Sequence, residues 1–192
     1  GQYSDNTTGE SFSYDAAHCG FSGYSICEYN GRNGILETLS SGNYLEEYHP
    51  DIVILQIGTN DIIDNHDIEN AGKRLDTLVT YILENIPESS VLFVTTIPDL
   101  APNEPDVYPW FSNYRHSADW TKEYSDEEVE KAVLSQIKNY NSQVKALIEK
   151  KQSDGIKNII IGDINSVVDN VSAQLKDGVH PNDTGYKLMG EY

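Results

Sequence analysis

Three polar residues have the types and the spacing that acyl transfer requires. Asp177 stands three residues before His180 in the segment Asp177-Gly178-Val179-His180-Pro181. A carboxylate there can accept the Nδ1 proton of the imidazole, which leaves Nε2 to act as a general base. Asn60, within Gly58-Thr59-Asn60-Asp61, can donate its side-chain amide to an oxyanion. The alternatives are an ordinary surface turn at Asp177–His180 and an Asx-type turn at Asn60.

The segments before these residues have the composition of strands in a parallel sheet. Residues 52–57 are a branched apolar run between Pro50 and Gly58, which is typical of a strand buried on both faces. Residues 91–97 and 159–161 are two further runs of this kind. Ligands of open parallel sheets bind at the carboxyl ends of the strands, so we expect Asn60 to lie in an active-site crevice.

Helical spacing of apolar residues separates the predicted strands. The repeat over residues 68–86 stops at Pro87, and Ser125 with Glu128 forms a capping box that opens a second long helix. Shorter helical segments are predicted over residues 35–48, broken near Ser41-Gly42, and a last helix begins near Gly185. Residues 1–34 are expected to be loops. Strands that alternate with helices predict an α/β fold with a parallel sheet.

Size and charge restrict the classes of partner. A chain of 192 residues is expected to form one domain, residues 1–192. Its formal charge of -18 disfavours nucleic acid and anionic membrane surfaces, and no apolar run approaches about 18 residues. Cys19 and Cys27 either form a disulfide in a secreted protein or stay reduced.

Several further residues are candidates for the same site. Gly23 can offer a backbone N–H where a side chain would block a substrate, or it is a plain turn glycine. Ser22, beside it, is a weak candidate nucleophile because no apolar strand leads into it. The aromatic loop over residues 99–124 carries Trp110 and Trp120, which either stack on sugar rings or pack the loop onto the domain.

No metal or cofactor is predicted from the sequence. The histidines at positions 18, 49, 66 and 116 have no metal-ligand spacing with one another. Asp61, Asp64 and Asp67 either gather a cation or form an acidic helix start.

The order of these motifs resembles one known family. Residues 18–26, with the sequence His-Cys-Gly-Phe-Ser-Gly-Tyr-Ser-Ile, are followed by the Gly-Thr-Asn-Asp, Thr-Thr-Ile-Pro-Asp and Asp-Gly-Val-His-Pro segments. Together they resemble the SGNH (GDSL-type) hydrolases, and within them carbohydrate esterase family three, the acetyl xylan esterases. The resemblance spans nearly the whole chain. It implies a flavodoxin-like three-layer α/β/α sandwich with a five-stranded parallel sheet.

The resemblance also implies roles for the residues. Gly23 and Asn60 would be the oxyanion donors, His180 the general base and Asp177 its orienting acid, and the reaction would need no metal or other cofactor. The substrate would be acetylated plant polysaccharide, and the chain would be secreted, as one module of a larger secreted or cellulosomal enzyme.

The chain departs from the family in one respect. The opening strand of the family, which ends in Gly-Asp-Ser with the nucleophilic serine, has no counterpart, and the chain holds no Gly-Asp-Ser. We therefore expect a domain truncated at both ends, with the serine outside these residues. The rival hypotheses are a carbohydrate-binding pseudoenzyme that lost its serine, and an SGNH lipase or thioesterase.

Overall fold

The structure is a computed structural model, and it describes residues 2–4, 11–13 and 20–192. Cys19 lies outside the described residues, so the predicted choice between a Cys19–Cys27 disulfide and two thiols stays open. Residues 20–192 carry the sheet, its covering helices and all the candidate site residues.

A three-stranded parallel sheet lies at the centre of the described chain. Its strands are β3 (Ile52–Leu55), β4 (Val91–Thr95) and β5 (Ile159–Gly162), in the order β3-β4-β5. The register aligns Ile54 with Phe93 and Phe93 with Ile160. All three strands were predicted, and the parallel pairing follows from the helix that separates each strand from the next.

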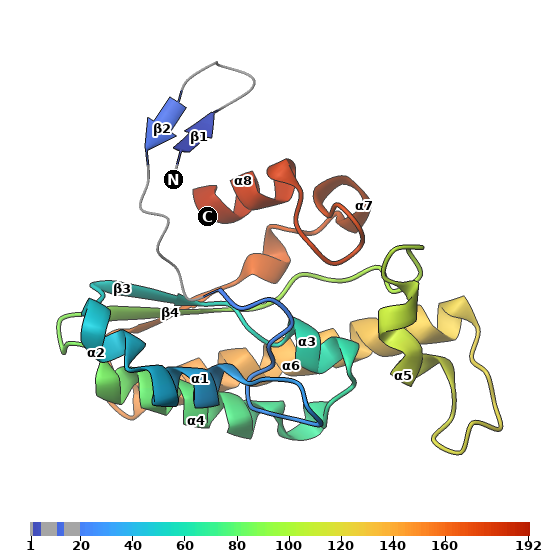
Figure 1. Cartoon of the computed structure of the whole chain (residues 1–192), viewed down its shortest axis with the longest axis horizontal. Coiled ribbons are helices and arrows are strands. Elements are labelled where there is room, and N and C mark those ends of the chain that lie inside the picture. Colours follow the sequence, from blue (N-terminus) through green and yellow to red (C-terminus); the bar gives the residue numbers. More distant parts are fainter. Residues whose placement is uncertain (1, 5–10, 14–19) are drawn as a thin grey trace.

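Two long helices cover one face of the sheet (Figure 1). Helix α4 (Ala71–Asn85) follows the short helix η1 (Ile68–Asn70) and buries Leu75, Leu78 and Ile82, which recur at helical spacing. Helix α6 (Asp126–Ser153) starts at the predicted capping box, in which Ser125 Oγ accepts from the N–H of Glu128 and the Glu128 carboxylate accepts from the N–H of Ser125. The predictions of both helices are confirmed.

Shorter elements complete the domain. Helices α1 (Ile35–Gly42) and α2 (Tyr44–Tyr48) precede β3, with the predicted break between them, and α3 (Thr59–Ile63) follows it. After β4 come η2 (Tyr108–Phe111) and α5 (Ser112–Arg115). After β5 come η3 (Ile164–Ser166), α7 (Val171–Gln174) and α8 (Asp183–Glu191). Figure 1 shows α7 and α8 on the side of the sheet opposite α4 and α6. The predicted α/β sandwich with a parallel sheet is confirmed, with three of the five expected strands among the described residues.

Two local predictions are wrong. The strand over residues 52–57 is not buried on both faces, because Ile52 and Ile54 are 59% and 72% exposed while Leu55 is buried. Within the described residues nothing packs over that side of β3, so burial alternates along the strand. The opening segment is not all loop either, because β1 (Gln2–Ser4) and β2 (Ser11–Ser13) pair antiparallel.

Among the helices of the described residues, none combines the length and the apolar character needed to cross a bilayer.

Candidate active site

Asp177 and His180 form a hydrogen-bonded pair in the turn before α8. Asp177 Oδ2 lies 2.8 Å from His180 Nδ1, and Oδ1 accepts from the backbone N–H groups of Val179 at 3.0 Å and His180 at 2.8 Å. Gly178 holds the turn with φ +88°, and a Cβ there would lie 2.7 Å from the carbonyl oxygen of Ala101. Glycine is therefore required between Asp177 and His180.

The electrostatics of this pair favour an ionised carboxylate. Partial burial raises the pKa of Asp177, but hydrogen bonds from the backbone and imidazole of His180 and from Val179 outweigh it and lower the pKa to about 2. An ionised Asp177 holds the proton on Nδ1 of His180. The Nε2 atom makes no hydrogen bond within the described part of the chain, and the side chain is 58% exposed. The imidazole is thus free to accept a proton at Nε2.

Asn60 lies in the first turn of α3, directly after β3. The sequence predicted a turn here, but Gly58 adopts φ +112° and the helix begins at the next residue. A side chain at position 58 would overlap the ring of Tyr140, so the close approach requires glycine. Asn60 Nδ2 donates to the carbonyl oxygen of Tyr24 at 2.8 Å. This bond uses one amide hydrogen and orients the other, which remains available to a ligand.

Gly23 is brought beside Asn60 by the same hydrogen bond, because Tyr24 follows it in the chain. Its φ of +79° is a conformation that favours glycine. The N–H of Gly23 donates to no acceptor among the described residues, whereas its carbonyl oxygen accepts from Arg32 Nη1 at 2.7 Å. A backbone donor and a side-chain donor therefore belong to segments that the Asn60–Tyr24 hydrogen bond joins.

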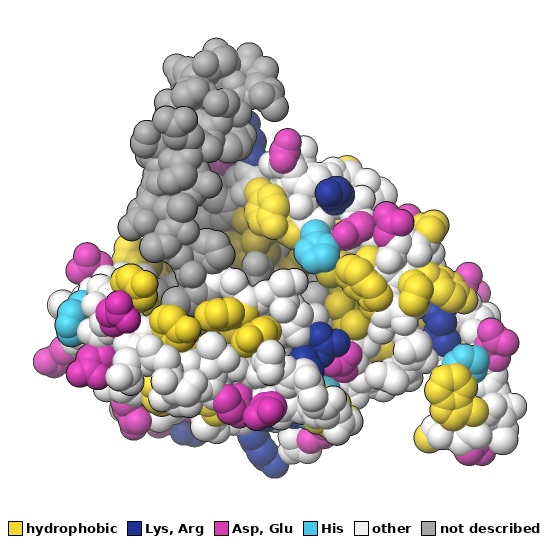
Figure 2. All heavy atoms as spheres, in the orientation of Figure 1, with side chains coloured by type: hydrophobic (Ala, Val, Ile, Leu, Met, Phe, Trp, Pro, Cys, Tyr) yellow, Lys and Arg dark blue, Asp and Glu magenta, His cyan; other side chains and the backbone are white. Residues whose placement is uncertain are grey.

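The segment between β4 and α6 connects the two halves of the site. At one end, the ring of Trp110 lies edge-on to the ring of His180, with centroids 6.0 Å apart. At the other, Asn113 Nδ2 donates to the carbonyl oxygen of Asp64 and the Tyr114 hydroxyl to that of Ile62, at 2.9 and 2.7 Å. Both acceptors belong to α3 and its C-cap, which follow β3. The segment that contacts His180 is therefore also bonded to the helix that carries Asn60. His180 and Asn60 thus lie on the same edge of the sheet, at the carboxyl ends of its strands. Figure 2 shows hydrophobic side chains gathered on this face between the positions that α5 and α7 have in Figure 1.

The two tryptophans predicted together are separated by the structure. Trp110 is 42% exposed and contacts His180, whereas Trp120 is 70% exposed and stacks on His116, with ring centroids 4.4 Å apart. Residues 116 and 123 form an isolated antiparallel bridge, so Trp120 sits in a hairpin-like loop. Figure 1 shows that loop extending from α5 away from α7. Trp110 is the better placed of the two to touch a ligand at His180.

The aspartates after Asn60 bind arginines. Asp61 is buried and accepts from the N–H of Ile26 at 3.1 Å and from Arg74 Nη2 at 3.2 Å, although burial raises the pKa of its carboxyl. Asp64 forms a bidentate pair with Arg32. The sequence did not suggest these pairs, because 32 residues separate Arg32 from Asp64. In the described chain no group of three or more His, Cys, Asp or Glu side chains is arranged to hold a metal ion.

Comparison with known proteins identifies the family. A sequence model of the family described as "GDSL-like Lipase/Acylhydrolase" matches residues 7–192. A multidomain esterase of Ruminococcus flavefaciens is 39% identical over 192 residues, which cover 97% of this chain and 21% of that protein. The chain thus spans only about a fifth of the length of this relative.

Two solved structures show the same fold. One is a carbohydrate esterase family 3 protein from Talaromyces cellulolyticus, with a TM-score of 0.52 and 17% identity over 77% of this chain and 56% of that one. An acetyl esterase with an acetate ion gives the same values. At this identity the likeness is one of fold, whereas the sequence match covers nearly every residue. The chain belongs to the GDSL-like (SGNH) lipase/acylhydrolase family.

Proposed function

We propose that this chain belongs to a serine O-acetyl esterase that removes acetyl groups from plant polysaccharide. The observation that carries the proposal is the Asp177–His180 pair, with Nε2 of His180 unbonded among the described residues, on the same sheet edge as the donors Asn60 and Gly23. Family membership supports ester hydrolysis in general. The acetyl group and the carbohydrate are supported by the names of the two structures of the same fold.

The proposed reaction gives each residue a defined task. A serine Oγ attacks the acetyl carbonyl carbon while its proton passes to Nε2 of His180. The N–H groups of Gly23 and Asn60 Nδ2 stabilise the oxyanion. The tetrahedral intermediate then expels the sugar oxygen, which takes the proton from His180. Water, deprotonated by His180, attacks the acetyl-serine, and acetate leaves as the serine recovers its proton.

The nucleophilic serine is proposed to lie outside these 192 residues. Ser22 is exposed, and among the described residues no hydrogen bond joins it to His180. Within the described sheet, β3 pairs only with β4, so its other edge is open to a further strand. A strand added there would end at the carboxyl edge that holds Asn60, where a serine is needed.

The remaining parts of the proposal concern the sugar contacts, the cofactors and the location of the enzyme. Trp110 and Trp120 are proposed sugar contacts, since exposed aromatic faces stack on sugar rings. The chemistry of the three residue types needs no metal or organic cofactor. We propose that the chain belongs to a secreted enzyme with additional modules, and the name of the multidomain relative supports the additional modules.

The experiment uses the full-length protein and 4-nitrophenyl acetate. His180→Ala should abolish turnover, and a fluorophosphonate probe followed by mass measurement should label a serine outside residues 1–192. Ser22→Ala and His116→Ala serve as matched controls that keep activity and labelling. Retained turnover in His180→Ala, or labelling of Ser22, would refute the proposed site.

A further inference from the structure

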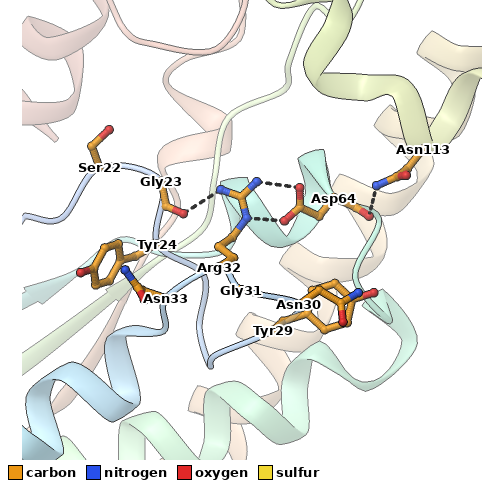
Figure 3. A pocket seen from close by; sticks show the side chains of 10 residues that line it. All are labelled: Ser22, Gly23, Tyr24, Tyr29, Asn30, Gly31, Arg32, Asn33, Asp64 and Asn113. Carbon is orange, nitrogen blue, oxygen red and sulfur yellow. Dashed lines mark hydrogen bonds and ion pairs between the residues drawn. The ribbon is translucent and has the colours of Figure 1, made fainter.

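A cavity of about 580 Å³ opens beside Gly23 and is not used by the proposed reaction steps (Figure 3). That volume falls in the range of about 300–1,000 Å³ found for small-molecule sites. It is far larger than an acetyl group needs. The described residues of its wall come from three places in the chain, the segment over residues 22–33, Asp64 and Asn113.

The Arg32–Asp64 pair makes this cavity electrically neutral. Arg32 donates through Nε and Nη2 to the two oxygens of Asp64, with the Nη2 bond 2.7 Å long, and through Nη1 to the carbonyl of Gly23. Figure 3 shows the guanidinium between that carbonyl and the carboxylate. No other described residue that lines the cavity is charged, so the described part of the wall offers no net attraction to a phosphate or to an ammonium group. A neutral ligand fits it best.

The cavity wall also offers polar groups that the protein itself leaves unused. The side-chain amides of Asn30 and Asn33 make no hydrogen bond within the described residues, and the same is true of Oδ1 of Asn113. Two tyrosine rings stand beside them and are fixed by stacking, Tyr24 on Phe21 at 5.0 Å and Tyr29 on His66 at 3.4 Å between centroids. Amides with spare donors and acceptors next to aromatic rings suit the hydroxyls and the apolar face of a sugar.

The cavity lies beside the proposed oxyanion donor, and this position indicates which part of an ester would bind in it. It borders Gly23, the proposed oxyanion donor, on one side. On the other it borders Asn113, three residues beyond Trp110, which contacts His180. An ester whose carbonyl oxygen is held by the Gly23 N–H would have its alcohol part within reach of this cavity.

We propose that this cavity is the subsite for the acetylated end of the sugar chain, with Asn33 and Asn113, which lie on opposite sides of the Arg32–Asp64 pair (Figure 3), binding hydroxyls of neighbouring rings. The inference rests on the proposed function, and it goes further by assigning the alcohol side of the substrate to named residues. Arg32 acts as a positioning residue, because it bonds both Gly23 and Asp64.

The test compares two acetyl esters in the full-length protein, acetylated xylobiose and 4-nitrophenyl acetate, which has no sugar hydroxyls. The double substitution Asn33→Ala with Asn113→Ala should lower the ratio of their kcat/KM values by about tenfold, through two lost hydrogen bonds. Both side chains are exposed, and the Tyr114 hydroxyl still bonds Ile62 when the Asn113 bond to Asp64 is lost, so the fold should tolerate the change. Asn85→Ala, an exposed asparagine at the end of α4, is the matched control and should leave the ratio unchanged.

Binding of unacetylated xylotriose, measured by calorimetry, provides a readout without turnover. The double variant should weaken this binding by about tenfold as well. If the wild-type protein hydrolyses neither ester, the proposed function fails and the xylotriose measurement alone decides the subsite. An unchanged substrate ratio, or a xylotriose affinity equal in variant and wild type, would overturn the inference.

Discussion

Replacing Asp177 by asparagine tests the role of the carboxylate without removing the side chain. The structure gives Asp177 three hydrogen bonds, two from backbone N–H groups to Oδ1 and one from the imidazole to Oδ2. In the variant, the amide oxygen can still accept from Val179 and His180. The amide nitrogen then faces Nδ1 of His180 and donates to it, which favours the tautomer that carries its proton on Nε2. That tautomer cannot accept a proton from a nucleophile at Nε2.

The magnitude of the loss follows from this geometry. A buried histidine held in the wrong tautomer loses about 10,000-fold in kcat. Here His180 is 58% exposed, so water can partly replace the carboxylate and the ring can turn. We therefore expect kcat to fall by about 100- to 10,000-fold. Stability should change little, by about 1 kcal/mol, because the turn keeps its backbone hydrogen bonds.

The assay is steady-state hydrolysis of 4-nitrophenyl acetate by the full-length protein, together with a thermal unfolding curve. Asp183→Asn, in the first turn of α8 and exposed, is the matched control and should keep wild-type kcat. A kcat within about threefold of wild type in Asp177→Asn, with a normal unfolding curve, would refute the tautomer argument.

Three further predictions concern neighbouring parts of the structure. Asn60→Ala should lower kcat for 4-nitrophenyl acetate by about 100- to 1,000-fold, and equal turnover would remove Asn60 from the oxyanion site. Gly58→Ala should lower the free energy of unfolding by about 2–5 kcal/mol in urea titrations, because it combines overlap with Tyr140 and a φ of +112°. The pKa of Asp177, about 2 when folded against the ordinary 3.8, means that its ionised form stabilises the fold at pH above 3.8 and that this contribution is lost as the pH falls toward 2. Thermal midpoints should therefore fall more steeply over that acidic range in wild type than in Asp177→Asn, and parallel curves would contradict the assigned shift.

The sequence allowed the main elements to be predicted because their signals are local. The apolar spacing before Pro87 and the capping box at Ser125 and Glu128 each depend on residues within a few turns. Asp177 and His180 could be paired for the same reason, since three residues separate them. Family membership agrees with the resemblance that the ordered motifs carry.

The rest depends on contacts between distant residues. The Arg32–Asp64 pair and the bond from Asn60 to Tyr24 join positions more than 30 residues apart, and no spacing rule indicates them. Trp110 and Trp120 look equivalent in the sequence, but only the first lies against His180. The sequence also did not indicate that Ile54 is exposed, because an apolar run does not show which face of a strand is covered by other elements.

The convergence of Asn60, Gly23 and His180 on one acyl carbon is the central claim, and a crystal structure of the full-length protein after fluorophosphonate labelling tests it most directly. We predict a phosphonyl group on a serine, with its oxygen within hydrogen-bond distance of Asn60 Nδ2 and of the Gly23 N–H, and with Nε2 of His180 facing the serine oxygen. A phosphonylated serine whose oxygen contacts neither donor would contradict the claim.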